Sequence, residues 1–186
     1  MEIVLARHGK PRLDRGAWIS PLQLPDWLRA FNATDVVNDD VSLLTLKRAA
    51  QSEFIVCSSL LRCVQSARIL APSRDIHIDE IFREAELPHA LWRFPRLPVS
   101  TWVILFRIAW FCGYSVNSES LSLATIRARG AAEKLIDLAR QHQSVFAMGH
   151  GIMTVLIAKQ LVLRGWTGPR RPTNKYWQYC VYQSPN

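Results

Sequence analysis

The chain has 186 residues, of which 49% are hydrophobic and 20% charged, and its formal net charge is +8. These values are typical of one globular domain spanning residues 1–186, and they exclude a disordered or low-complexity chain. The basic residues are scattered without a run of five or six, so we expect no nucleic-acid partner. A phosphate-bearing substrate explains the excess of arginine equally well.

The first predicted element is a buried strand, because residues 3–6 form an unbroken apolar run that leads into Arg7-His8-Gly9. Gly9 is a turn former and ends the strand. Open α/β folds bind ligands at the carboxyl edge of the sheet, so Arg7 and His8 are the first candidate site residues. Helices are expected next, over residues 26–31 and 41–52.

The run Glu53-Phe54-Ile55-Val56-Cys57 predicts a second buried strand, which ends at Ser58-Ser59. Either serine can cap the helix expected from Leu60 to Leu70. Arg62 then lies in the first turn of that helix, where a positive charge works against the helix dipole. A bound anion would explain its presence, because helix N-termini and guanidinium groups both suit phosphate.

A short strand at residues 75–78 leads to an acidic loop that contains Glu84 and Glu86 and is bounded by Pro88. Both carboxylates are solvated by default, but one of them can act as a general acid if the loop folds over the arginines. The stretch from Pro88 to Pro98 is expected to form an ordered cover. Together with the helix after it, this cover is expected to shape the leaving-group pocket.

Residues 101–113 are apolar enough to predict a core helix that ends at Gly113. The apolar window is about 13 residues long, short of the roughly 20 needed to span a bilayer. We therefore expect no membrane partner, with peripheral membrane contact as the alternative. Ser118 is a candidate cap for the next helix, which runs to about Gln141.

A third buried strand is expected at residues 144–148, where it runs into Gly149-His150-Gly151. A helix over residues 152–163 and an edge strand over residues 176–182 complete the chain. Three apolar strands thus end in residues suited to phosphate chemistry, and the carboxyl ends of parallel strands lie side by side. Arginines would repel a cation, so this set indicates an anion site and neither a metal nor another cofactor.

At these residues the sequence resembles the histidine phosphatase superfamily, which is also called phosphoglycerate mutase-like. The matching motifs are Leu5-Ala6-Arg7-His8-Gly9, Ser58-Ser59-Leu60-Leu61-Arg62-Cys63 with Ser66-Ala67, Phe82-Arg83-Glu84, Ser118-Glu119-Ser120 and Gly149-His150-Gly151. The resemblance implies a three-layer α/β/α sandwich around a mostly parallel central sheet.

The resemblance also implies a role for each candidate. His8 would be the nucleophile that becomes phosphohistidine, and Glu84 the proton donor, with Glu86 as the fallback acid. Arg7, Arg62 and His150 would hold the phosphoryl oxygens. Gly9 and Ser58, which adjoin these residues in the sequence, are further possible site residues.

The expected activity is that of a metal-independent phosphatase acting on a phosphomonoester, either a phosphorylated small molecule or a phosphoprotein. Lys10-Pro11 replaces the Thr and Asn-containing loop that mutase-like members have, and this favours a phosphatase over a phosphoglycerate-type mutase. An inactive phosphate-binding module is the third alternative. Cysteines without a C-x-x-C pair and a start without a secretion signal indicate the cytoplasm, and the oligomeric state stays open.

Overall fold

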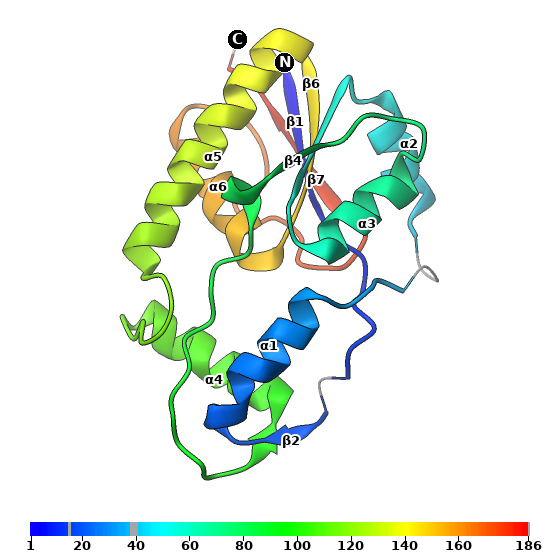
Figure 1. Ribbon diagram of the computed structural model, residues 1–186. Helices are drawn as coiled ribbons and strands as arrows, with labels where there is room; N and C mark the ends of the chain where they lie inside the picture. Colours follow the sequence, from blue (N-terminus) through cyan, green and yellow to red (C-terminus); the bar gives the residue numbers. More distant parts are fainter. Residues whose placement is uncertain (15, 38–40, 186) are drawn as a thin grey trace.

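The computed structural model describes residues 1–14, 16–37 and 41–185 (Figure 1). The strands are β1 (Glu2–Arg7), β2 (Trp18–Ile19), β3 (Phe54–Ser58), β4 (His77–Asp79), β5 (Leu97–Pro98), β6 (Ser144–Gly149) and β7 (Tyr179–Gln183). The helices are α1 (Leu24–Asn32), α2 (Leu43–Gln51), α3 (Leu61–Leu70), α4 (Val99–Phe111), α5 (Leu121–His142) and α6 (Gly151–Leu163), with short 3-10 helices η1 (Pro21–Gln23) and η2 (Glu80–Phe82).

A five-stranded sheet with the order β4-β3-β6-β1-β7 forms the centre of the molecule. β1 and β3 both pair in parallel with β6, and β4 pairs in parallel with β3. β7 runs antiparallel to β1 at the edge. It begins at Tyr179, later than the sequence predicts, because Trp177 has a φ of 60° that no extended strand accommodates.

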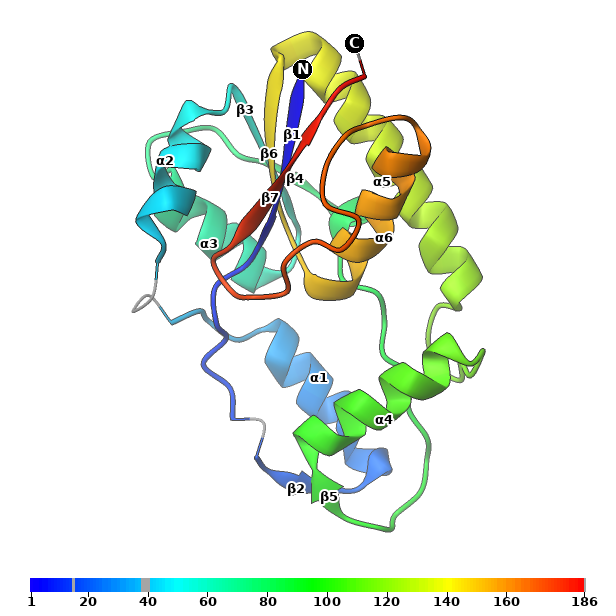
Figure 2. The ribbon, with the colours of Figure 1, turned by 180° about the vertical axis from the view of Figure 1, so that it is seen from behind.

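The two faces of the sheet are covered by different helix pairs, which the two opposite views show clearly (Figures 1 and 2). Side chains alternate across a strand, so Ile3 and Leu5 of β1 pack with α5 and α6, whereas Val4 and Ala6 pack with α2 and α3. This unbroken apolar run is buried on both sides, as parallel strands require. The predicted three-layer α/β/α sandwich with a mostly parallel sheet is confirmed.

A smaller part of the molecule, made of residues 16–32 and 87–118, lies beyond the carboxyl ends of the parallel strands (Figure 1). We call it the cap. Its short strands β2 and β5 pair with each other, and α1 and α4 share a separate apolar cluster that includes Leu24, Trp102 and Phe106. The sequence does not predict this unit, because two-residue strands carry no periodic signal.

The expectation of a core helix at residues 101–113 is wrong in part. α4 begins at Val99, and Trp102, Phe106 and Trp110 pack inward, but the apolar side chains of Ile104 and Ile108 are exposed. The helix is apolar all round, a pattern that usually marks full burial, yet it covers the cap on one side only. Within the described ranges, no helix combines the length and apolar character needed to cross a membrane.

The predicted caps of two helices also need correction. α5 is capped by Ser120 and not by Ser118, because the Ser120 hydroxyl accepts a hydrogen bond from the amide of Leu123 at 3.2 Å. α3 begins one residue later than predicted, with Leu60 at its cap position. The Ser58 hydroxyl accepts a 3.3 Å hydrogen bond from the Leu60 amide, so Ser58 supports the turn before the helix.

The cap of α5 can be tested by paired substitutions. Ser120→Ala removes the acceptor for a first-turn amide and should lower the free energy of unfolding by about 1 kcal/mol. Ser118→Ala, three residues outside the helix, should change it by less than about 0.5 kcal/mol. Urea denaturation of both variants measures the difference, and equal effects would contradict the assignment of the cap.

Candidate active site

His8 follows β1 at the carboxyl edge of the sheet, and its side chain is buried. Its Nδ1 lies 2.7 Å from the carbonyl oxygen of Gly9. A carbonyl oxygen can only accept a hydrogen bond, so we assign the proton of the neutral ring to Nδ1. In the neutral ring Nε2 then carries the lone pair that a nucleophilic histidine needs.

Gly9 allows a close approach that no larger residue permits. A Cβ atom at this position would lie 2.1 Å from the ring of Trp177. The Gly9 amide donates a 2.8 Å hydrogen bond to the hydroxyl of Ser66, which in turn donates to the Arg62 carbonyl at 2.6 Å. Gly9 and Ser66 thus join the loop after β1 to the first turns of α3.

His150 lies between β6 and α6 and is fully buried. Its ring centre is 5.1 Å from that of His8, and its Nε2 lies 2.8 Å from the hydroxyl of Ser58. Burial, followed by the positive charge of Arg62, holds the pKa of His150 well below its ordinary value. At neutral pH the ring is therefore uncharged and can donate one hydrogen bond to an anion.

Both candidate arginines are held by neutral groups from distant segments. The buried Arg62 donates a 2.9 Å hydrogen bond to the Asn32 side chain, and its guanidinium carbon lies 4.7 Å from the centre of the Phe31 ring. Arg7 donates to the carbonyl of Asn174 and stacks on Tyr176 at 4.2 Å. Two cations in a buried site suit a ligand of negative charge.

Three residues that support these arginines were missed by sequence reasoning: Asn32, Asn174 and Tyr176. The ring of Tyr176 lies 5.6 Å from that of His8 as well as against Arg7. Asn32 ends α1 in the cap, and the other two belong to the loop before β7. Nothing in their local sequence marks them, because only the tertiary fold brings them to the sheet edge.

Glu84 lies against the first turn of α6, next to His150. Its carboxylate accepts hydrogen bonds from the amides of Met153 at 2.9 Å and Ile152 at 3.3 Å. Amides in the first turn of a helix have no partner within the helix itself, and the helix dipole favours negative charge there. The loop carrying Glu84 is thereby fixed at the start of α6, which directly follows His150.

Glu86 has a different environment. Its side chain is exposed, and the carboxylate accepts a 2.7 Å hydrogen bond from the amide of Glu119. In return, the Glu86 amide donates to the Glu119 carboxylate at 3.3 Å. Glu86 therefore joins the acid loop to the segment before α5, whereas Glu84 is the carboxylate beside His150.

Two further arginines hold the acid loop. The Arg127 guanidinium forms an ion pair with Glu119 and donates hydrogen bonds to the carbonyls of Ile81 and Arg83 at 3.0 and 2.7 Å. Arg107 of α4 donates to the carbonyl of Ala85 at 2.9 Å. Sequence reasoning missed both arginines, although it did single out Glu119 as part of a motif.

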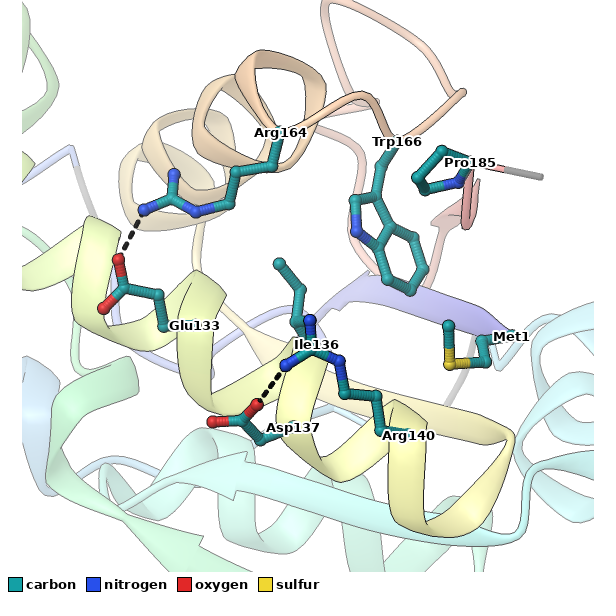
Figure 3. A pocket seen from close by; sticks show the side chains of 8 residues that line it. All are labelled: Met1, Glu133, Ile136, Asp137, Arg140, Arg164, Trp166 and Pro185. Atoms are coloured by element: carbon teal, nitrogen blue, oxygen red, sulfur yellow. Dashed lines mark hydrogen bonds and ion pairs between the residues drawn. The ribbon is translucent and has the colours of Figure 1, made fainter.

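A hollow of about 460 Å³ lies at the opposite end of the sheet, beside Met1 and between α5 and the end of α6 (Figure 3). Its arginines are already paired with carboxylates, Arg164 with Glu133 and Arg140 with Asp137. In the part of the chain that the structure describes, no group of three His, Cys, Asp or Glu side chains is placed to hold a metal ion.

The sequence of residues 43–182 matches the profile of the histidine phosphatase superfamily (branch 1). The chain therefore belongs to the histidine phosphatase superfamily. The matched residues include Arg62, Glu84 and His150, and the fold adds His8 from outside the matched range. Among curated proteins, no sequence matches this chain significantly.

Solved structures confirm the fold. A putative alpha-ribazole-5'-P phosphatase from Escherichia coli superposes with a TM-score of 0.60 at 14% identity, over 87% of this chain and 80% of its own. The mycobacterial glucosyl-3-phosphoglycerate phosphatase gives 0.56 at 18% identity, over 87% and 79%. A phosphoserine phosphatase from Entamoeba histolytica gives 0.55 at 16% identity, over 87% and 80%.

The lowered pKa of His150 predicts a pH dependence of stability. Because the folded-state pKa is below the ordinary value of about 6.5, the unfolded chain binds the extra proton first as the pH falls. The stability that uncharged His150 contributes to the folded state is fully present above about pH 6.5. Below that pH it is lost, by up to about 1.4 kcal/mol per pH unit. His150→Asn should flatten this slope in chemical denaturation, while the two profiles run parallel above about pH 7. Equal slopes of stability against pH in the two proteins below about pH 7 would contradict the prediction.

Proposed function

We propose that this protein is a metal-independent phosphatase that hydrolyses a phosphomonoester through a phosphohistidine intermediate on His8. The single observation that carries the proposal is the pairing of two buried histidines, 5.1 Å apart, with Arg7 and Arg62 at one sheet edge. The arginines would bind an anion next to the proposed nucleophile His8.

In the first step, Nε2 of His8 attacks phosphorus. The N–P bond forms as the bond from phosphorus to the leaving oxygen breaks, and the Nδ1 proton stays on its hydrogen bond to the Gly9 carbonyl. That hydrogen bond also holds the ring in one orientation and stabilises the positive charge that develops on it. Water in the second step restores the neutral ring.

Arg7, Arg62 and His150 would hold the three non-reacting oxygens of the phosphoryl group. The guanidinium groups offset negative charge as it spreads over these oxygens in the transition state. The two arginines are already held in place, Arg62 by Asn32 and Phe31, and Arg7 by Tyr176 and the Asn174 carbonyl. Little rearrangement is therefore needed when the substrate binds. Neutral His150 contributes a hydrogen bond without adding a proton that would have to be removed.

Glu84 would give its proton to the leaving oxygen, and in the second step it would take one from the attacking water. Water then forms the new bond to phosphorus, the N–P bond breaks, and phosphate leaves with Glu84 protonated again. The position of Glu84 at the first turn of α6, which follows His150, supports this role, whereas Glu86 is engaged with Glu119. We expect the substrate to be a phosphorylated small molecule or a phosphoprotein.

Replacing the nucleophile tests the reaction directly. Release of phosphate from p-nitrophenyl phosphate in the presence of EDTA should fall by at least about a thousandfold in His8→Ala. A labelled phosphoryl group should be trapped on the wild-type protein and not on the variant. His77→Ala, which changes an exposed histidine on β4, is the matched control and should keep full activity.

The alternatives give different results in the same assay. Transfer of the phosphoryl group to phosphoglycerate in preference to water would show a mutase. A wild-type protein that binds phosphate but never releases it from a panel of esters would show an inactive binding module, and the proposal would be wrong.

The identity of the acid is tested by Glu84→Gln and Glu86→Gln, which keep size while removing the proton donor. Glu84→Gln should lower kcat by about a hundredfold or more. Glu86→Gln should leave kcat within about threefold. A larger loss for Glu86→Gln would reverse the assignment.

A further inference from the structure

The end of the cap furthest from the sheet carries a group of exposed apolar side chains, Trp18, Leu91, Trp92 and Phe94, which we call the apolar tip. Trp18 is 67% exposed, Trp92 60% and Phe94 77%. The segment between η2 and β5 that holds three of them runs away from the carboxyl ends of the parallel strands to the far end of the cap (Figures 1 and 2). The predicted cover over the site is therefore not formed by residues 91–96, all of which are exposed.

The backbone beneath the apolar tip is held by hydrogen bonds. The Trp92 carbonyl accepts a 3.0 Å hydrogen bond from the Leu22 amide, and Trp18 pairs with Pro98 where β2 meets β5. The indole of Trp102 donates to the Ile19 carbonyl at 2.8 Å from beneath. The aromatic side chains are thus presented outward on an anchored frame, and patches of this kind mark interaction sites.

The segment that carries most of the apolar tip has positive charges only. Arg93 and Arg96 are exposed between and beside the aromatic residues, and no acidic residue occurs from Leu87 to Ser118. The whole cap holds four arginines and one aspartate, a net charge of +3. That aspartate, Asp26, is already paired with Arg29.

The outer side of α4 adds a second exposed apolar surface to the cap. Ile104, Ile108 and Phe111 are exposed and follow helical spacing, on the side opposite to the packed Trp102 and Phe106. A water-facing helix normally carries polar residues here. Burial of this surface against a partner would remove several large apolar side chains from water at once.

We propose that the cap docks on the surface of an anionic lipid bilayer through the apolar tip. Tryptophan and phenylalanine would enter the boundary between headgroups and acyl chains, where amphipathic and aromatic rings are stabilised. Arg93 and Arg96 would lie at the level of the lipid phosphates and bind them. This proposal revises the expectation of no membrane partner, and it does not rest on the catalytic role of His8.

A lipid surface suits the charge pattern better than a second copy of the chain. In a symmetric dimer through the tip, the same patch faces itself, so two patches that each carry the positive charges of Arg93 and Arg96 would be brought together. Like charges brought together without counter-ions oppose association. Anionic phosphates supply the missing negative charge, and they leave the aromatic residues free to enter the acyl region.

The test is flotation of the full chain with vesicles of phosphatidylcholine, alone or mixed with phosphatidylglycerol. The wild-type protein should bind the mixed vesicles and bind them more weakly as NaCl is raised. Trp92→Ala with Phe94→Ala should raise the lipid concentration for half-binding at least about tenfold. The matched control is Leu43→Ala with Leu44→Ala, because these α2 side chains are as exposed, at 73% and 68%, but lie outside the cap.

Arg93→Glu with Arg96→Glu should weaken binding to the mixed vesicles by about tenfold or more and remove its salt dependence. All three double variants should keep the wild-type rate on p-nitrophenyl phosphate without vesicles, which separates this proposal from the proposed function. Absence of vesicle binding, or equal binding by the Trp92/Phe94 and Leu43/Leu44 variants, would overturn it. Sedimentation that showed a dimer lost only in Trp92→Ala with Phe94→Ala would assign the tip to a second copy instead.

Discussion

The parallel pairing of β1 and β3 with the central β6 is the constraint on which the rest of the structure depends. It places Arg7 opposite Gly149 and Cys57 opposite Met148, so the segments after all three strands emerge at one edge. His8, Ser58 and His150 meet there although they are far apart in sequence. A shift of one residue in either pairing would turn alternate side chains to the other face and separate them.

The charge of the site depends on how deeply this edge is buried. His150 stays neutral because it is buried and lies beside Arg62, while both arginines are held by amide, carbonyl and aromatic groups. A bound anion would therefore meet Arg7 and Arg62 beside the uncharged ring of His150. The acid loop completes the arrangement because Arg127 and Arg107 hold its carbonyls and the start of α6 holds Glu84.

The cap has two sides with different chemistry. Its inner side supplies Asn32 and Phe31 to Arg62 and Arg107 to the acid loop, so it supports the site. Its far end and the outer side of α4 expose apolar residues next to arginines. The histidine site lies between the sheet and the inner side of the cap. Contact of the far end with an anionic surface would therefore not involve the site.

The sequence by itself determined the buried parallel strands and the positions of His8, Arg62 and His150 at their ends, because short apolar runs, their turn residues and helix starts are local signals. The three-layer α/β/α arrangement was implied by the resemblance to a known family. It could not separate Glu84 from Glu86, because the two are two residues apart and differ only in what α6 and Glu119 offer them. It misplaced the cap of α5 and predicted full burial of α4, because apolar content does not reveal whether a partner covers each side of a helix. Tertiary contacts decided the cap of α5 and the exposure of α4. They also gave the two carboxylates different partners, and they brought Asn32, Asn174, Tyr176 and Arg127 to the site from segments without any local motif.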